Sequence, residues 1–216
     1  MSYKLAIFDM DGTVLDTLDD LANAVNHTLI KFGMPTRSNR EVRSYLGNGV
    51  RRLIESAAPD GTKEAVIDEM LQFYRAYYGE HSADKTAPYK GIEQALKKLR
   101  ENGCKTALLS NKPDAPAVAL TKKYFDGLFD YAAGEKEGIE RKPSPDGLYP
   151  IFETFRIDKS EAVFIGDSEV DIMTAKNADM DCIAVTWGFR DRDELIAAGG
   201  LMLADSADEL LRLILS

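Results

Sequence analysis

Short apolar runs without polar alternation recur along the chain and predict buried strands. Short, unbroken runs of apolar residues are typical of parallel strands that are covered on both faces. The runs span residues 4–9, 105–110, 162–167, 182–187 and, more weakly, 201–204.

Segments between these runs carry apolar residues at helical spacing. Residues 92–99 and 148–155 show this pattern, and the second segment has a helix-start signal near Pro145. The C-terminal segment begins with an N-cap signal at Ser206 and a capping-box residue at Glu209. Strands that alternate with helices predict an α/β fold with a Rossmann-like, doubly wound parallel sheet.

Residues 18–84 break the alternation, because they contain no convincing strand. Apolar stripes at helical spacing cover residues 18–32, 50–57 and 66–77, with turn signals between them. We therefore predict an α/β core of residues 1–15 and 86–216, interrupted by an all-helical domain of residues 16–85.

Composition narrows the classes of function. A net charge of −9 argues against a nucleic-acid partner, which normally requires a basic face. The sequence has no apolar run near membrane-spanning length and no signal-peptide pattern, so we expect a cytoplasmic protein without a membrane partner. We expect it to be a monomer or a homodimer. Two cysteines and two histidines that lie far apart give no support for a zinc site.

Polar residues end three of the predicted strands: Asp9, Ser110 and Asp167. One such residue is explained by the preference of turns for Asp, but three at the carboxyl ends of parallel strands indicate a ligand site. Asp9 and Asp11 point the same way in an extended chain, with Cα atoms about 6.5–7 Å apart. This spacing suits one carboxylate that attacks a reacting group and another that handles a proton.

The predicted acidic site needs cations. Carboxylate and carbonyl oxygens select a hard ion such as Mg²⁺, for which Asp167 is a further ligand. Lys142, fixed before Pro143, is the best candidate for a balancing ammonium group, and Lys112 is the alternative. Asp171 either supports the metal site or stabilises a helix N-terminus.

Four motifs in this order, DMDGT, LLSNK, RKPSPD and GDSEVD, resemble those of the haloacid dehalogenase superfamily. The helical insert resembles the type-1 cap domain of that family. Within the superfamily, the segments YLGNGVRRLIESA, KPSPDGL and VTWGFRDRDELIAAG resemble the branch of phosphoglycolate phosphatases.

The resemblance implies roles for individual residues. Asp9 is expected to be the nucleophile, Asp11 the general acid and base, and Lys142 the balancing cation. The remaining roles follow the motifs: phosphate binding by Thr13, Ser110 and Asn111, Mg²⁺ ligation by Asp9, the Asp11 carbonyl and Asp167, and support from behind by Asp171.

The expected function is Mg²⁺-dependent hydrolysis of a small phosphorylated metabolite through an aspartyl-phosphate. A phosphosugar mutase of the β-phosphoglucomutase type and a pyrophosphatase of the same superfamily are alternatives, and a phosphoryl-binding regulator without turnover is a third. In the cap, Gly49, Arg51 and Arg52 are candidates for substrate recognition, although two solvated arginines on a helix explain the pattern equally well.

Overall fold

A computed structural model describes residues 2–216 and contains a six-stranded sheet in the order β5-β4-β1-β6-β7-β8, with every neighbouring pair parallel. The strands are β1 (Leu5–Phe8), β4 (Lys105–Pro113), β5 (Tyr131–Glu135), β6 (Ala162–Gly166), β7 (Asp181–Val185) and β8 (Met202–Ala204). The sheet confirms the predicted Rossmann-like α/β fold class.

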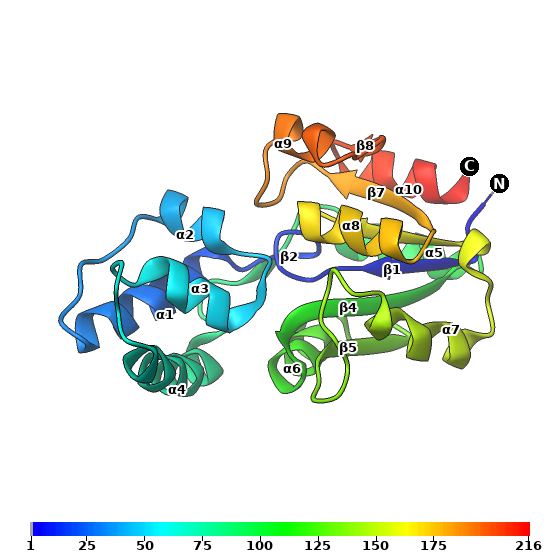
Figure 1. The fold of residues 1–216 in the computed structure, drawn as a ribbon. Coiled ribbons are helices and arrows are strands. Elements are labelled where there is room, and N and C mark those ends of the chain that lie inside the picture. The colour runs from blue at the N-terminus through cyan, green and yellow to red at the C-terminus, as the bar shows by residue number, and fades with distance from the viewer. Residues whose placement is uncertain (1) are drawn as a thin grey trace. The chain divides into compact units, whose positions relative to one another are not determined.

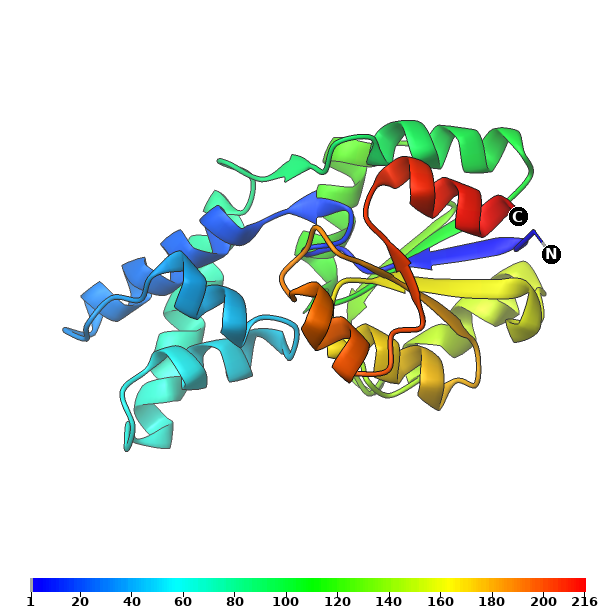
Figure 2. The ribbon, with the colours of Figure 1, turned by 90° about the horizontal axis from the view of Figure 1, so that it is seen from above.

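Helices connect the strands and cover both faces of the sheet (Figure 1). They are α5 (Ile92–Glu101), α6 (Asp114–Phe125), α7 (Tyr149–Phe155), α8 (Glu169–Asn177), α9 (Arg192–Ala197) and α10 (Ala207–Leu215). Figure 2 shows α5 and α10 side by side, where the two helices are in contact. No helix within residues 2–216 is long and apolar enough to cross a membrane.

The strand β1 is buried on both faces, as its unbroken apolar run predicts. Leu5 and Ile7 belong to a core cluster with Ile151 of α7 and further residues of β4, β6 and α8. Phe8 packs edge-to-face on Phe129, which in turn packs on Phe125 of α6. Side chains of β1 thus alternate between two cores, and no position in the strand is free for a polar residue before its end.

The position of β1 determines where the polar strand ends meet. It lies between β4 and β6, and Phe8 is in register with Leu108 and Ile165. The strands β4 and β5 lie on one side of β1, and β6, β7 and β8 lie on the other. The carboxyl end of β1 is therefore the topological switch point of the sheet. Asp9 directly follows β1, and Asp167 directly follows the neighbouring strand β6.

A second compact unit spans residues 16–87 and is helical between its two ends, whereas residues 2–15 and 88–216 form the first unit. Its helices are α1 (Leu18–Lys31), α2 (Asn39–Tyr45), α3 (Gly49–Ala57) and α4 (Glu64–His81). The chain returns to the first unit at residue 88 and not at residue 86. Two short paired strands, β2 (Leu15–Asp16) and β3 (Ala87–Pro88), mark the two crossings.

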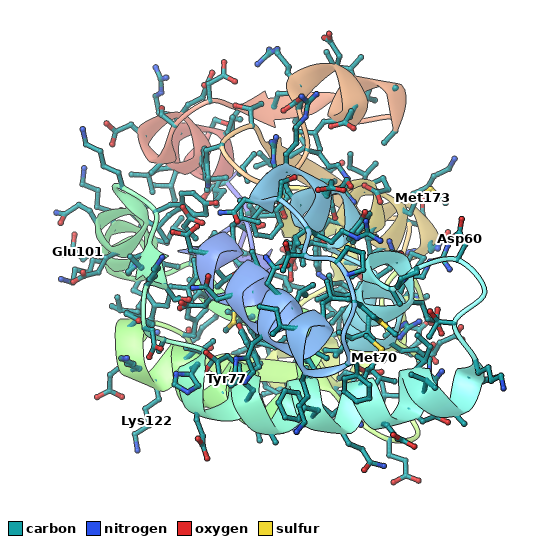
Figure 3. All side chains as sticks on the ribbon, turned by 90° about the vertical axis from the view of Figure 1, so that its left-hand side faces the viewer. Asp60, Met70, Tyr77, Glu101, Lys122 and Met173 are labelled. Carbon is teal, nitrogen blue, oxygen red and sulfur yellow. The ribbon has the colours of Figure 1, made fainter. Side chains whose placement is uncertain are left out.

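Inside the helical unit, α1 packs on α4, and Figure 3 shows Met70 and Tyr77 on α4 in this layer. Met70 is fully buried, and the Tyr77 ring stacks on His27 of α1 with centroids 4.0 Å apart. Asp20, buried near the start of α1, accepts hydrogen bonds from the backbone N–H groups of Lys85 and Thr86. This carboxylate anchors the returning chain to the first helix.

The structure differs from the sequence-based expectation in several elements. The strand expected over residues 182–187 ends at Val185, and the strand expected over residues 105–110 continues to Pro113. The edge strand β5 and the helix α2 were not predicted. Their sequences, YAAGE and NREVRSY, contain small or polar residues and lack an apolar run or stripe.

Candidate functional site

Lys142 and Asp9 form an ion pair at the carboxyl end of β1. The Lys142 Nζ atom lies 2.8 Å from Asp9 Oδ1 and 2.7 Å from Asp171 Oδ1, and its side chain is only 3% exposed. The Nζ atom also lies over the ring of Phe164, 5.2 Å from its centroid, in a cation–π contact. Asn111 supports this arrangement, because its side-chain amide donates to the Lys142 carbonyl at 2.9 Å.

The carboxylate of Asp171 contacts both Lys142 and the start of α8. Its Oδ1 atom accepts a hydrogen bond from Lys142, while its Oδ2 atom accepts hydrogen bonds from the Ser168 hydroxyl at 2.7 Å and the Ser168 N–H at 3.1 Å. The carboxylate therefore caps the N-terminus of α8 and holds Lys142 at the same time. Both of its oxygens are engaged by protein donors.

Asp167 is buried and held by the loops around it. Its Oδ1 atom accepts from the Thr13 hydroxyl at 3.2 Å, and its Oδ2 atom accepts from the Phe189 N–H at 2.6 Å. Gly12 has φ +83°, and a Cβ atom there would lie 2.2 Å from Asp167 Oδ2. The glycine of the DMDGT motif is thus required both for its conformation and for the close approach of this carboxylate.

A second buried lysine pairs with the other acidic residue of the DxD motif. Lys112 Nζ lies 3.0 Å from Asp11 Oδ2, and the lysine side chain is 2% exposed. The backbone N–H of Lys112 donates to the Ser110 hydroxyl at 3.2 Å. The sequence offered Lys142 and Lys112 as alternatives, but the structure places both at the site, on different carboxylates.

Burial and mutual repulsion perturb the acidic groups. Burial raises the pKa of Asp9 to about 7; Lys142 opposes this rise, and the neighbouring carboxylates of Asp171 and Asp11 add to it. Burial also raises the pKa of Asp167 well above its usual range, helped by the charges of Asp171 and Asp9. For Lys142, burial favours the neutral amine, but the two carboxylates beside it raise its pKa above the ordinary value.

The donor set fits a hard divalent cation. Carboxylate oxygens of Asp9, Asp167 and Asp171 lie within 4.8 Å of one another. Asp171 is ion-paired with Lys142, whereas Asp167 accepts its hydrogen bonds from the neutral groups of Thr13 and Phe189, which leave its charge for a metal. Asp11 Oδ1 is buried and accepts no hydrogen bond within residues 2–216. The three clustered carboxylates of Asp9, Asp167 and Asp171 share one ammonium group, Lys142, and a divalent ion would offset this local excess of negative charge.

Comparison with known proteins assigns the family. A model of the haloacid dehalogenase-like hydrolases matches residues 6–185. The chain belongs to this family. Curated relatives named phosphoglycolate phosphatase support the assignment: one from Pseudomonas syringae pv. tomato is 32% identical over 96% of this chain and 78% of the relative. Another, from Psychrobacter arcticus, is 33% identical over 88% of this chain and 86% of the relative.

Two solved structures are similar to this chain over nearly its whole length. A Lactobacillus delbrueckii subsp. bulgaricus protein, provisionally named phosphoglycolate phosphatase, has a TM-score of 0.95 and 36% identity, with complete coverage of both chains. CbbY from Rhodobacter sphaeroides, crystallised in complex with phosphate, has a TM-score of 0.75 and 25% identity over 96% of each chain. The family resemblance that the four motifs carried is therefore confirmed.

This haloacid dehalogenase-like site contains a loop that the sequence did not reveal. The segment 186–190, expected in part to be strand, leaves β7 and supplies the Phe189 N–H to Asp167. Gly188 is needed there, since a Cβ atom would lie 2.3 Å from Asp167 Cβ. The Trp187 indole N–H donates to the Thr13 carbonyl at 3.1 Å. A backbone donor such as the Phe189 N–H leaves no mark in the sequence. The adjacent Trp187 and Gly188 were the only sequence signal for this loop.

The predicted recognition residues of the helical unit lie at the start of α3. Gly49 begins the helix, and Arg51 contacts Glu55, Glu64 and Asp68. Arg52 is 65% exposed and lies 3.8 Å from Glu55. Substrate recognition by these residues stays a prediction, and the positive charge of Arg51 is already balanced inside its own unit.

Proposed function

We propose that this chain is a Mg²⁺-dependent phosphatase that hydrolyses a small phosphoglycolate-like phosphomonoester through an aspartyl-phosphate on Asp9. The chain is a phosphoric monoester hydrolase, in keeping with its family and with the names of its relatives. The use of Mg²⁺, the aspartyl-phosphate intermediate and the identity of the substrate are our proposal.

One observation carries the mechanism: Asp9 is a buried carboxylate with an ammonium group 2.8 Å from one oxygen and a second acidic side chain, Asp167, beside it. A nucleophile for phosphoryl transfer must be anionic and must also approach an anionic phosphoryl group. Lys142 reduces this repulsion and fixes the carboxylate in place. Such alignment and charge compensation supply most of the catalysis of phosphoryl transfer.

In the first step, an Asp9 carboxylate oxygen attacks phosphorus while the bond from phosphorus to the ester oxygen breaks. The Asp11 carboxyl group donates its proton to that oxygen, and the alcohol leaves. The phosphoryl group is now bonded to Asp9. Ser110, at the end of β4, and Asn111 next to it are the proposed hydrogen-bond donors to the phosphoryl oxygens.

In the second step, water attacks the same phosphorus atom and the bond between phosphorus and Asp9 breaks. The Asp11 carboxylate, which lost its proton in the first step, removes one from the water. Inorganic phosphate leaves, and Asp9 is an anion again. Asp11 thus needs to contact both the leaving alcohol and the attacking water, and its place two residues beyond the nucleophile keeps it close to the reacting phosphorus.

Asp9, the Asp11 carbonyl and Asp167 would hold the Mg²⁺ ion, and Thr13 and Phe189 keep Asp167 in place for it. When bound, Mg²⁺ supplies positive charge that offsets the phosphoryl oxygens and orients them toward the nucleophile. The raised pKa values of Asp9 and Asp167 support this role, because two crowded buried carboxylates ionise fully only when a cation accompanies them.

Phosphate release from a panel that includes 2-phosphoglycolate, a hexose 1-phosphate and pyrophosphate tests the proposal. We expect release from 2-phosphoglycolate with Mg²⁺, no release with EDTA, and none from Asp9→Asn. In Asp11→Asn, which keeps the nucleophile but hydrolyses the intermediate slowly, we expect intact-protein mass spectrometry to show a phosphoryl adduct on Asp9.

The exposed Asp60, labelled in Figure 3, provides a matched control, because Asp60→Asn makes the same chemical change on a surface loop. This variant should retain wild-type activity. Isomerisation of the hexose phosphate without net phosphate release would instead identify a mutase. Phosphate release that persists in Asp9→Asn after repeated purification would refute the proposed nucleophile.

A further inference from the structure

The two buried lysines at the site divide between the two acidic residues of the DxD motif. Lys142 contacts Asp9 and Asp171, whereas Lys112 contacts Asp11. The proposed mechanism uses Lys142 at the nucleophile but leaves the charge of Lys112 without a task. Lysine side chains are seldom as fully buried as that of Lys112, which is 2% exposed, so its position calls for a function.

We propose that Lys112 is the specificity-determining residue of this enzyme and binds a carboxylate carried by the leaving alcohol. This inference rests on the proposed function and names its substrate class: phosphomonoesters of short hydroxy acids. Recognition of the substrate anion is thereby assigned to the α/β unit and not to the arginines of the helical unit.

The geometry follows from Asp11. As the proton donor, Asp11 hydrogen-bonds the ester oxygen of the substrate, and Lys112 Nζ lies 3.0 Å from Asp11 Oδ2. Lys112 is therefore on the leaving-group side of the site. In a phosphorylated 2-hydroxy acid, the carboxylate is attached to the carbon that bears the ester oxygen, so it reaches an ammonium group that already lies next to Asp11.

The strand β4 holds Lys112 in this position. Lys112 is the penultimate residue of the strand, and its N–H donates to the hydroxyl of Ser110, a proposed phosphoryl ligand. The phosphoryl site and the ammonium group are thus connected through three consecutive residues of one strand. This short connection favours a substrate whose two anionic groups are close together.

The cations of the helical unit are less suited to the same task. Arg51 is surrounded by Glu55, Glu64 and Asp68, and a substrate carboxylate would have to compete with these three acidic groups. Arg52 is 65% exposed, so water screens its charge. Lys112 is buried, and interactions with a buried charge are stronger because solvent screens them less.

Steady-state kinetics on two matched substrates tests the inference. Ethyl phosphate has the carbon count of 2-phosphoglycolate but carries a methyl group in place of the carboxylate. We expect Lys112→Met to lower kcat/KM about 100-fold for 2-phosphoglycolate and by less than about threefold for ethyl phosphate. The decisive comparison is between Lys112→Met and the wild type on each substrate. The two substrates cannot be compared directly with each other, because their leaving alcohols differ in acidity and hence in intrinsic reactivity.

Lys112→Arg keeps the charge and should retain the preference for 2-phosphoglycolate. Lys122→Met is the control for charge removal: Lys122 is exposed on α6 (Figure 3), so both substrates should react as with wild type. Thermal unfolding of each variant establishes that it is folded.

An equal loss on both substrates would overturn the inference, since Lys112 would then act only on Asp11 or on folding. The inference would also be overturned if Lys112→Met hydrolysed both substrates as fast as the wild type does. Hydrolysis of neither substrate, nor of p-nitrophenyl phosphate, would refute the proposed function instead. In that case calorimetric titration with 2-phosphoglycolate still judges Lys112, because equal affinity of wild type and Lys112→Met would exclude a carboxylate contact.

Discussion

Lys142 lies in the loop between β5 and α7, and its Nζ atom is 2.8 Å from Oδ1 of Asp9, which directly follows β1. The pair is buried, and a third residue, Asp171, holds the lysine from the other side. The same ammonium group thus serves stability and chemistry, because it balances charges that the fold could not otherwise bury.

Lys142→Met should therefore damage both properties. We expect kcat/KM to fall by about 100- to 1000-fold, the usual effect of removing one electrostatic contact at a reacting centre. We also expect the free energy of unfolding to fall by about 3 kcal/mol, because two buried carboxylates lose their partner. Phosphate release and urea denaturation measure the two effects on the same preparation.

Lys159→Met is the matched control for this change. Lys159 lies 3.0 Å from Asp179, but the two side chains are 47% and 91% exposed. Exposed ion pairs contribute less than about 1 kcal/mol, so neither stability nor activity should change measurably. If Lys142→Met behaved like this control, the buried ion pair would have no importance for folding or catalysis.

Stability should depend on pH and Mg²⁺ together. Asp9 has a folded-state pKa of about 7, above its unfolded value, so the metal-free folded protein binds a proton that the unfolded chain has released. Between about pH 4 and pH 7 the unfolding free energy of the metal-free protein should accordingly decrease as pH rises, by a few kcal/mol. The raised pKa of Asp167 acts in the same direction.

Mg²⁺ binds the ionised carboxylates, so it should raise the melting temperature more at pH 8 than at pH 5. Differential scanning fluorimetry at both pH values, with Mg²⁺ or EDTA, measures this difference. Asp9→Asn removes the group that titrates and should reduce both the pH dependence and the response to Mg²⁺. An equal Mg²⁺ effect at the two pH values would show that the ion binds elsewhere.

The sequence allowed the site to be predicted wherever a buried strand ends in a polar residue. Asp9 and Asp167 stood out because the preceding runs are apolar on both faces, which only a covered parallel strand tolerates. Lys142 was found by the need for a cation in an extended loop. These inferences depend on local pattern and charge, which the sequence displays directly.

Other features depend on tertiary packing and left weak signals. The strand β5 is an edge strand of small residues, so it lacks the apolar run that marks the central strands. The burial of Lys112 beside Asp11 is decided by how β4 continues past Ser110, which an isolated lysine in the sequence does not show. The Phe189 N–H is a backbone group, and its role is independent of side-chain identity.

The loop after β7 can be tested through Gly188. A Cβ atom at this position would lie 2.3 Å from Asp167 Cβ and 2.5 Å from the Gly12 carbonyl oxygen. Real Cβ atoms do not approach other atoms so closely, so Gly188→Ala must displace either the loop or Asp167. Because Asp167 is a proposed metal ligand, we expect the Mg²⁺ concentration for half-maximal activity to rise at least about tenfold, while most of the fold is retained.

Gly79→Ala makes the same substitution in the helix α4, where a Cβ atom would meet nothing within 4 Å. This control should leave Mg²⁺ activation unchanged and should stabilise the protein slightly, because alanine favours a helix. Saturating Mg²⁺ should restore part of the activity of Gly188→Ala if the loop acts through the metal site. A loss of kcat that no Mg²⁺ concentration relieves, with unchanged half-saturation, would show that the loop positions a different group.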